Sequence, residues 1–198
     1  RGEPQRRQGA RDFAELAHGP SWAEGRRADR GGPSYARGMK PGEHPEFFRF
    51  PAPEGRSRES KIRLDGEGKF FDHGGYVEHA KLQQALHTWI GRHPDDGRYI
   101  LTNGYDWTYF TVDDVPFFVR AIREVDGDAM LVLSDETEEP LDPATVTMGP
   151  HGDLYLEVKH PSPDKAKSGP FRAKLTRHAQ TQLGPFLDER EGRAILRT

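Results

Sequence analysis

The chain has 198 residues, and its 29 Lys and Arg against 32 Asp and Glu give a net charge of −3 at neutral pH. It contains no cysteine, which excludes disulfides, thiolate metal sites and cysteine nucleophiles and fits a reducing compartment. No apolar run approaches the roughly 20 residues that a membrane-spanning helix needs. We therefore expect a soluble, cytoplasmic protein.

Residues 1–57 differ in composition from the rest of the chain. They contain nine Gly and seven Pro, and ten Arg and one Lys stand against eight acidic residues. A segment with so few clustered apolar side chains cannot bury enough surface to offset the entropy lost on ordering. We predict a mostly disordered, basic N-terminal arm with two docking points, Phe13–Leu16 and Phe47–Phe50.

The predicted folded core, residues 58–190, begins with a unit that spans residues 62–90. Its first part is a hairpin, because Ile62–Leu64 and Lys69–Phe71 are short apolar runs and the glycines of Asp65–Gly68 supply the positive φ of a tight turn.

The next elements are a helix and a sheet. Glu78–Ile90 is predicted to be helical because apolar residues recur on one face at helical spacing. These residues are Leu82, Ala85, Leu86, Trp89 and Ile90. Residues 98–134 then alternate β-rich runs with Gly-containing turns, which predicts a central antiparallel meander. The runs are Arg98–Thr102, Trp107–Val112, Val115–Arg123 and Ala129–Ser134.

Residues 146–187 repeat the layout of the first unit and end in a predicted helix over Pro170–Leu187. The apolar stripe of that helix is Phe171, Leu175, Ala179, Leu183 and Phe186. Both predicted helices carry the tripeptide Ala-Lys-Leu, at Ala80–Leu82 and Ala173–Leu175. The patterns predict an α+β fold with two lobes, in which two related hairpin–helix units flank the central meander. A frayed tail is expected at 191–198.

Four stretches of the core carry a resemblance to a known family. They are IRLDGEGKFF, AKLQQALHTWI, DDGRYILTNGYDWTYFTVDDVPFFV and FRAKLTRHAQTQL, within Lys61–Leu187. This region resembles the bacterial domain-of-unknown-function family DUF1285. The resemblance implies an α+β fold with repeated motifs and two lobes, and a ligand-binding or signalling role. It implies no reaction, so it assigns no catalytic residue.

The histidines and a long acidic stretch are the residues of the sequence that could hold a metal ion. His79 and His87 lie eight residues apart on the predicted helix, which is too far for one metal ion, because helix-borne ligands sit four apart. The stretch from Glu124 to Val158 has ten acidic residues and no Lys or Arg, but not the ligand spacing of a calcium loop. We expect ordinary polar-surface histidines, a solvated acidic surface, no metal site and no nucleic-acid binding.

Catalytic motifs are absent from the sequence. There is no G-x-S-x-G elbow, no Walker loop and no dinucleotide fingerprint, so no cofactor is predicted. Asp113 and Asp114 are adjacent on a predicted strand and point to opposite faces, which argues against an acid–base pair. The enzyme alternative is a site between the lobes that uses Asp113, His73 or His178 with Arg120.

The predicted ligand site combines aromatic and guanidinium side chains. Trp107 and Tyr109 share one strand face, where they either pack in the core of the sheet, which is the commoner arrangement, or are partly exposed and line an apolar pocket. Arg120 follows on a nearby strand, and Arg172 and Arg177 lie on the second predicted helix. Such a set suits a small anionic or planar ligand, because Arg pairs bidentately and also stacks. The alternative is that the arginines pair with the acidic stretch.

The leading functional hypothesis is a soluble bacterial, non-enzymatic module for small-ligand binding or regulation in signal transduction. The first alternative is an enzyme with its site between the lobes. The second is a protein-interaction module that uses the basic N-terminal arm to dock on an acidic protein partner.

Overall fold

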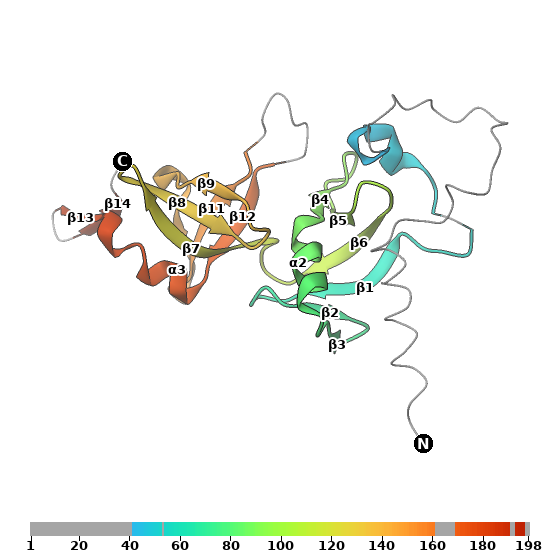
Figure 1. Cartoon of the computed structure of the whole chain (residues 1–198), viewed down its shortest axis with the longest axis horizontal. Helices are drawn as coiled ribbons and strands as arrows, with labels where there is room; N and C mark the ends of the chain where they lie inside the picture. The colour runs from blue at the N-terminus through green and yellow to red at the C-terminus, as the bar shows by residue number, and fades with distance from the viewer. Residues whose placement is uncertain (1–40, 53, 161–168, 191–192, 197–198) are drawn as a thin grey trace, which may run out of the picture.

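The protein is mostly β and consists of two lobes, each built on a six-stranded mixed sheet (Figure 1). The computed structural model describes residues 41–52, 54–160, 169–190 and 193–196. Two α-helices lie within these described residues, α2 (Ala80–Thr88) and α3 (Arg177–Thr181). None of the described helices is long and apolar enough to cross a membrane.

The first lobe (the N-lobe) contains the first six strands in the order β3-β2-β1-β6-β5-β4. Their bounds are β1 Glu59–Leu64, β2 Phe70–Asp72, β3 Gly75–Tyr76, β4 Ile90–Arg92, β5 Tyr99–Thr102 and β6 Trp107–Val112. The turn from β1 to β2 is held by Asp65, whose Oδ1 accepts from the amides of Glu67 and Lys69 at 2.9 and 2.8 Å. Gly68 closes this turn at φ +79°, a conformation that L side chains rarely adopt.

The helix α2 packs on one face of the N-lobe sheet. His79 caps its first turn, since its Nδ1 accepts from the amide of Leu82 at 3.2 Å. The side chain of Gln83 exchanges hydrogen bonds with the amide and carbonyl of Phe70 and thereby fixes the helix against β2. Leu86 is fully buried, and it joins a cluster with Leu64 and Phe70.

The second lobe (the C-lobe) contains the next six strands in the order β10-β11-β12-β7-β8-β9. Their bounds are β7 Phe117–Val125, β8 Asp128–Leu133, β9 Glu138–Pro140, β10 Thr147–Met148, β11 Leu154–Val158 and β12 Phe171–Leu175. In both sheets the chain starts at the centre, moves to one edge, restarts at the other edge and returns to the centre. The first and sixth strands of each lobe, β1 with β6 and β7 with β12, therefore pair in parallel.

The predicted central meander over 98–134 was wrong, because the structure divides it between the two sheets. β5 and β6 belong to the N-lobe, whereas β7 and β8 belong to the C-lobe. The chain leaves the first sheet at Asp113, whose amide donates to the carbonyl of Leu64 at 3.0 Å. Pro116 then lacks the amide that continued pairing would need. The two sheets span 59–112 and 117–175, a division that differs from the predicted units 62–90 and 146–187.

The predicted helix over Pro170–Leu187 was also wrong in its first part, which is the strand β12. Phe171, Ala173 and Leu175 are buried in alternation with outward polar residues, which is the two-residue period of a strand. Helical structure begins after Thr176, whose hydroxyl accepts from the amide of Ala179 at 3.2 Å, and it ends in a 3₁₀ turn, η5 (Gly184–Phe186). The apolar residues of the predicted stripe are all buried, but in three different elements.

Residues 187–190 and 193–196 form a two-stranded antiparallel ribbon; the frayed tail expected at 191–198 overlaps its second strand, and residues 191–192 and 197–198 lie outside the described residues. Its strands are β13 (Leu187–Arg190) and β14 (Arg193–Leu196). The apolar run Ala194–Leu196 gives β14 a sequence that suits a strand, which composition-based reasoning about a charged terminus did not take into account.

The lobes contact one another through side chains from both sheets. Tyr99 of the N-lobe stacks on Phe171 of the C-lobe with ring centroids 6.4 Å apart, and the guanidinium of Arg92 lies over both rings. On the other side, the amide of Gln84 on α2 donates to the carbonyl of Ser134 at 3.1 Å. The two lobes therefore contact each other both through stacked rings and through a hydrogen bond.

Candidate functional site

A short segment from the N-terminal arm crosses the face of the N-lobe sheet that lies opposite α2. We call residues 41–52 the strap; it contains the 3₁₀ turns η2 (Pro41–Glu43) and η3 (Pro45–Arg49). Phe47 is buried against Ile100 and Trp107. Docking at the Phe47–Phe50 patch, expected from the sequence, is thus observed, while residues 1–40 with the second docking point Phe13–Leu16 lie outside the described residues.

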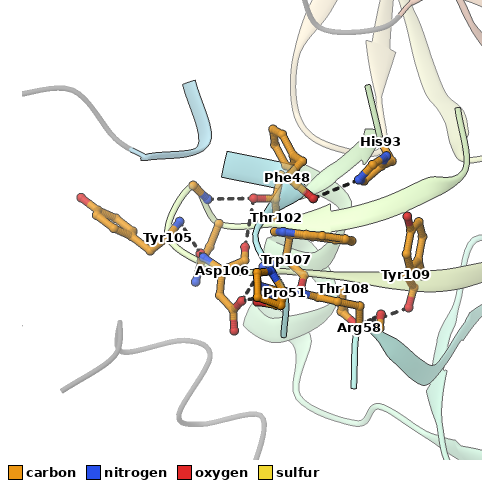
Figure 2. A network of polar contacts seen from close by, with 12 residues as sticks. Phe48, Pro51, Arg58, His93, Thr102, Tyr105, Asp106, Trp107, Thr108 and Tyr109 are labelled. Atoms are coloured by element: carbon orange, nitrogen blue, oxygen red, sulfur yellow. Dashed lines mark hydrogen bonds and ion pairs between the residues drawn. The ribbon is translucent and has the colours of Figure 1, made fainter. Parts of the chain in front are cut away.

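Main-chain and charged contacts fasten the strap along its length, and Figure 2 shows one of them, between His93 and Phe48. His93 Nε2 donates to the carbonyl of Phe48 at 3.1 Å, and this tautomer follows because His93 Nδ1 accepts from the amide of Asp95. Arg49 forms a two-pronged pair with the carboxylate of Asp95, at 2.8 and 3.0 Å. The amide of Gly42 donates to the carbonyl of Gly104 at 2.8 Å.

Arg58 holds the end of the strap to the sheet. Its guanidinium donates to the carboxylate of Asp106, to the carbonyl of Trp107 at 2.7 Å and to the carbonyl of Pro51 at 3.2 Å. It also lies over the Trp107 ring, 4.5 Å from the centroid. One side chain therefore joins the strap, the β5–β6 loop and the aromatic floor, as Figure 2 shows.

The floor under the strap is a cluster of aromatic rings. The rings of His93 and Tyr109 lie 5.0 and 5.1 Å from the ring of Trp107, and Phe48 of the strap lies 6.0 Å from it. Trp107 is only 5% exposed, so the core-packing interpretation holds for this residue and the alternative of partial exposure does not. Its indole Nε1 is buried and has no hydrogen-bond partner in the described part of the chain.

Tyr109 carries a fixed hydroxyl at the rim of this floor. The hydroxyl donates to Asp96 Oδ2 at 2.8 Å, and Arg98, paired with Glu59 at 2.8 Å, lies over the ring at 3.7 Å. Burial and the hydrogen bond to the Asp96 carboxylate raise the pKa of Tyr109 to about 12. The hydroxyl therefore remains a hydrogen-bond donor at neutral pH.

We define the strap site as Ile100, His93, Trp107 and Tyr109 with the rim residues Arg58 and Asp95. Chemically, this arrangement holds the strap in three ways: aromatic rings of the strap pack on its apolar floor, a main-chain carbonyl of the strap accepts from His93, and a cation of the strap pairs with Asp95. Its charged groups are matched in pairs, so it has no excess of positive charge for an anion.

The structure brings together two of the five predicted ligand-site residues. Trp107 and Tyr109 lie in the strap site, whereas Arg120, Arg172 and Arg177 belong to the C-lobe. Arg120 on β7 donates to Gln84 at 3.3 Å, Arg172 on β12 lies 4.1 Å from the Tyr155 ring centroid, and Arg177 is the first residue of α3.

Sequence reasoning missed His93, Arg58 and Asp95 as site residues. The signal that could have found them was the Phe47–Phe50 patch, because an apolar run within a polar arm requires a complementary apolar surface elsewhere in the chain. Its contacts lie 45 and 46 residues away along the chain, beyond the reach of local patterns.

The residues of the enzyme alternative lie on separate elements. Asp113 accepts from Arg63 at the end of β6, His73 lies exposed between β2 and β3 and pairs with Asp72, and His178 lies on α3. In the residues that the structure describes, no group of three or more His, Asp or Glu could hold a metal ion.

A small cavity lies between α2 and the N-lobe sheet. Its volume is about 10 Å³, enough for a single water molecule but not for a metabolite. It is lined by Ile62, Leu86, Trp89, Leu101, Asn103, Asp106 and Thr108.

Comparisons with known proteins support the resemblance found in the sequence at the level of the fold. No family model matches the chain, and no curated protein matches it significantly. Among solved structures, a DUF1285 family protein from Silicibacter pomeroyi DSS-3 is 13% identical with a TM-score of 0.51, over 76% of this chain and 92% of that one. A DUF1285 family protein from Shewanella baltica OS155 is 16% identical with a TM-score of 0.44, over 61% and 87%.

Proposed function

We propose that this chain is a non-enzymatic regulatory binding module, and that its strap site binds a protein segment that presents neighbouring aromatic residues in a 3₁₀ turn, as the strap does. The observation that supports this most is the bond from His93 Nε2 to the carbonyl of Phe48 beside the buried ring of Phe47. Main-chain hydrogen bonds that give affinity, combined with side-chain contacts that give specificity, are the two parts of peptide recognition. The strap then acts as an internal occupant that a partner segment must displace.

The two sheets differ at equivalent strands, and the difference supports a docking role for the N-lobe. β6 and β12 are each the sixth strand of their lobe and pair in parallel with the first. The face of β12 that points away from the C-lobe core carries Arg172 and Lys174 and is polar. The corresponding face of β6 carries Trp107 and Tyr109, which need an apolar cover.

The other functional hypotheses find less support in the geometry. A small anionic or planar ligand would need Arg120, Arg172 or Arg177 beside Trp107, but these arginines belong to the other lobe. The interaction-module hypothesis assigned binding to the basic arm, and the strap is a part of that arm that contacts the N-lobe. The proposed function therefore retains a role for the arm, but the expected partner is a segment with aromatic residues and not an acidic protein.

The proposal predicts that a strap peptide binds in trans once the strap is weakened. In the full-length Phe47→Ala/Phe48→Ala chain, a fluorescent peptide of residues 41–52 with the natural sequence should bind saturably, as measured by anisotropy. A peptide that carries the same two alanines should bind at least ~30-fold more weakly, since a buried Phe side chain contributes about 2 kcal/mol.

Phe50 supplies the matched control, because its side chain in the strap is 41% exposed. A peptide with Phe50→Ala should bind within a factor of about three of the natural peptide. Equal binding of all three peptides, or binding of none to a chain whose near-ultraviolet circular dichroism shows it to be folded, would overturn the proposed function.

A further inference from the structure

Four carboxylates lie around the strap site, and strap release would leave one of them without its cation. Asp106 keeps its pair with Arg58. Asp96 keeps its bond from the Tyr109 hydroxyl, and Glu59 keeps its two-pronged pair with Arg98. Asp95, by contrast, pairs with Arg49 of the strap itself. An open strap site therefore exposes the carboxylate of Asp95, ready for a cation of an incoming segment.

The position of Asp95 is fixed relative to the main-chain anchor. Its amide donates to His93 Nδ1 at 3.3 Å, and the same imidazole donates through Nε2 to the carbonyl of Phe48. The turn is closed by the amide of Gly97, which donates to the carbonyl of His93 at 2.9 Å. The carboxylate thus faces the residue that directly follows the anchored carbonyl, which in the strap is Arg49.

The pair has the geometry of selective recognition. Arg49 presents Nε and one terminal nitrogen to the two carboxylate oxygens, an arrangement that a planar guanidinium makes and an ammonium cannot. The hydrogen bond and charge of Arg49 lower the pKa of Asp95 from its ordinary value, so the carboxylate stays ionised. Both side chains lie at the rim, 56% and 43% exposed, so the pair can exchange with a competing segment.

We infer that the strap site selects partner segments in which arginine directly follows the aromatic pair, and that Asp95 is the specificity-determining residue. This inference rests on the proposed function. It specifies the sequence that the partner segment should have, which is two aromatic residues followed by arginine. Lysine at the third position should bind less tightly, and glutamate least tightly.

The test uses the full-length Phe47→Ala/Phe48→Ala chain and three peptides of residues 41–52 that carry Arg, Lys or Glu at position 49. We expect the Arg peptide to bind about twofold more tightly than the Lys peptide and about five- to tenfold more tightly than the Glu peptide, with the difference shrinking in high salt. Adding Asp95→Lys should reverse the order, so that the Glu peptide binds best.

Glu67→Lys is the matched control, because it makes the same charge change at an exposed N-lobe position in the β1–β2 turn. It should leave the order of the three peptides unchanged. Equal affinities for all three peptides, or an order that Asp95→Lys does not reverse, would refute the selectivity and leave the proposed function standing. No binding by any peptide would instead refute the proposed function itself.

Discussion

Replacing Leu86 or Leu175 with Ala should lower the free energy of unfolding by about 2–5 kcal/mol at each position. Leu86 on α2 is 0% exposed in the N-lobe core, and Leu175 on β12 is 1% exposed in the C-lobe core. Removing three carbons from a close-packed site loses their transfer free energy and leaves a cavity that the neighbours fill only in part. Urea denaturation of the full chain measures both losses.

Leu187→Ala is the matched control, because the same atoms are removed from a side chain that is 38% exposed. Its cost should stay below about 1 kcal/mol. If Leu86→Ala and Leu175→Ala cost no more than the control, the assignment of α2 and β12 to the two cores is wrong.

The second large effect is a loss of stability in acid that is caused by His87. This side chain is 1% exposed, and burial, followed by the charge of Arg120, lowers its pKa from 6.5 to about 4. Between these values the unfolded chain takes up a proton that the folded chain does not, so stability falls as the pH drops through this window. The total loss should be about 3 kcal/mol by pH 4, and no further loss from this group is expected below it.

His87→Gln should remove this part of the pH dependence, because glutamine does not titrate and can still donate to the carbonyl of Gly68. The measurement is the free energy of unfolding from urea denaturation between pH 7 and pH 4 for both chains. If the free energy of unfolding falls with pH by the same amount in the wild type and in His87→Gln, the buried imidazole does not contribute to the loss of stability in acid.

Local patterns predicted several strands but not how they are shared between sheets. The run Trp107–Val112 is β6, as its aromatic and β-branched content indicated. β12 was taken for a helix because Phe171, Leu175 and Ala179 also fit helical spacing, and a short apolar segment satisfies both periods. The parallel pairs β1–β6 and β12–β7 join strands far apart in the chain, and no local pattern in either strand encodes its partner.

The candidate site was predictable to a similar degree. The shared face of Trp107 and Tyr109 and the docking of the Phe47–Phe50 patch follow from side-chain alternation and local hydrophobicity. The pairing of Arg49 with Asp95 depends on how the β4–β5 turn meets the strap, which is a property of the folded N-lobe. Arg120 was placed beside Trp107 because a single meander was assumed, and the division at Asp113–Pro116 puts it in the other lobe.

The central claim is that strap and partner segment compete for one site, and one measurement tests it most directly. It compares the affinity of the natural peptide of residues 41–52 for the wild-type chain and for the Phe47→Ala/Phe48→Ala chain. The fraction of open strap in the wild type follows independently from hydrogen exchange at the Gly42 amide, which donates to the carbonyl of Gly104.

If strap and peptide share the site, the affinity of the wild-type chain for the peptide should equal that of the Phe47→Ala/Phe48→Ala chain multiplied by the fraction of wild-type molecules with an open strap. The two values should agree within about twofold. Equal affinities for the two chains, measured while the Gly42 amide of the wild type remains protected, would show that the peptide binds elsewhere and would contradict the account.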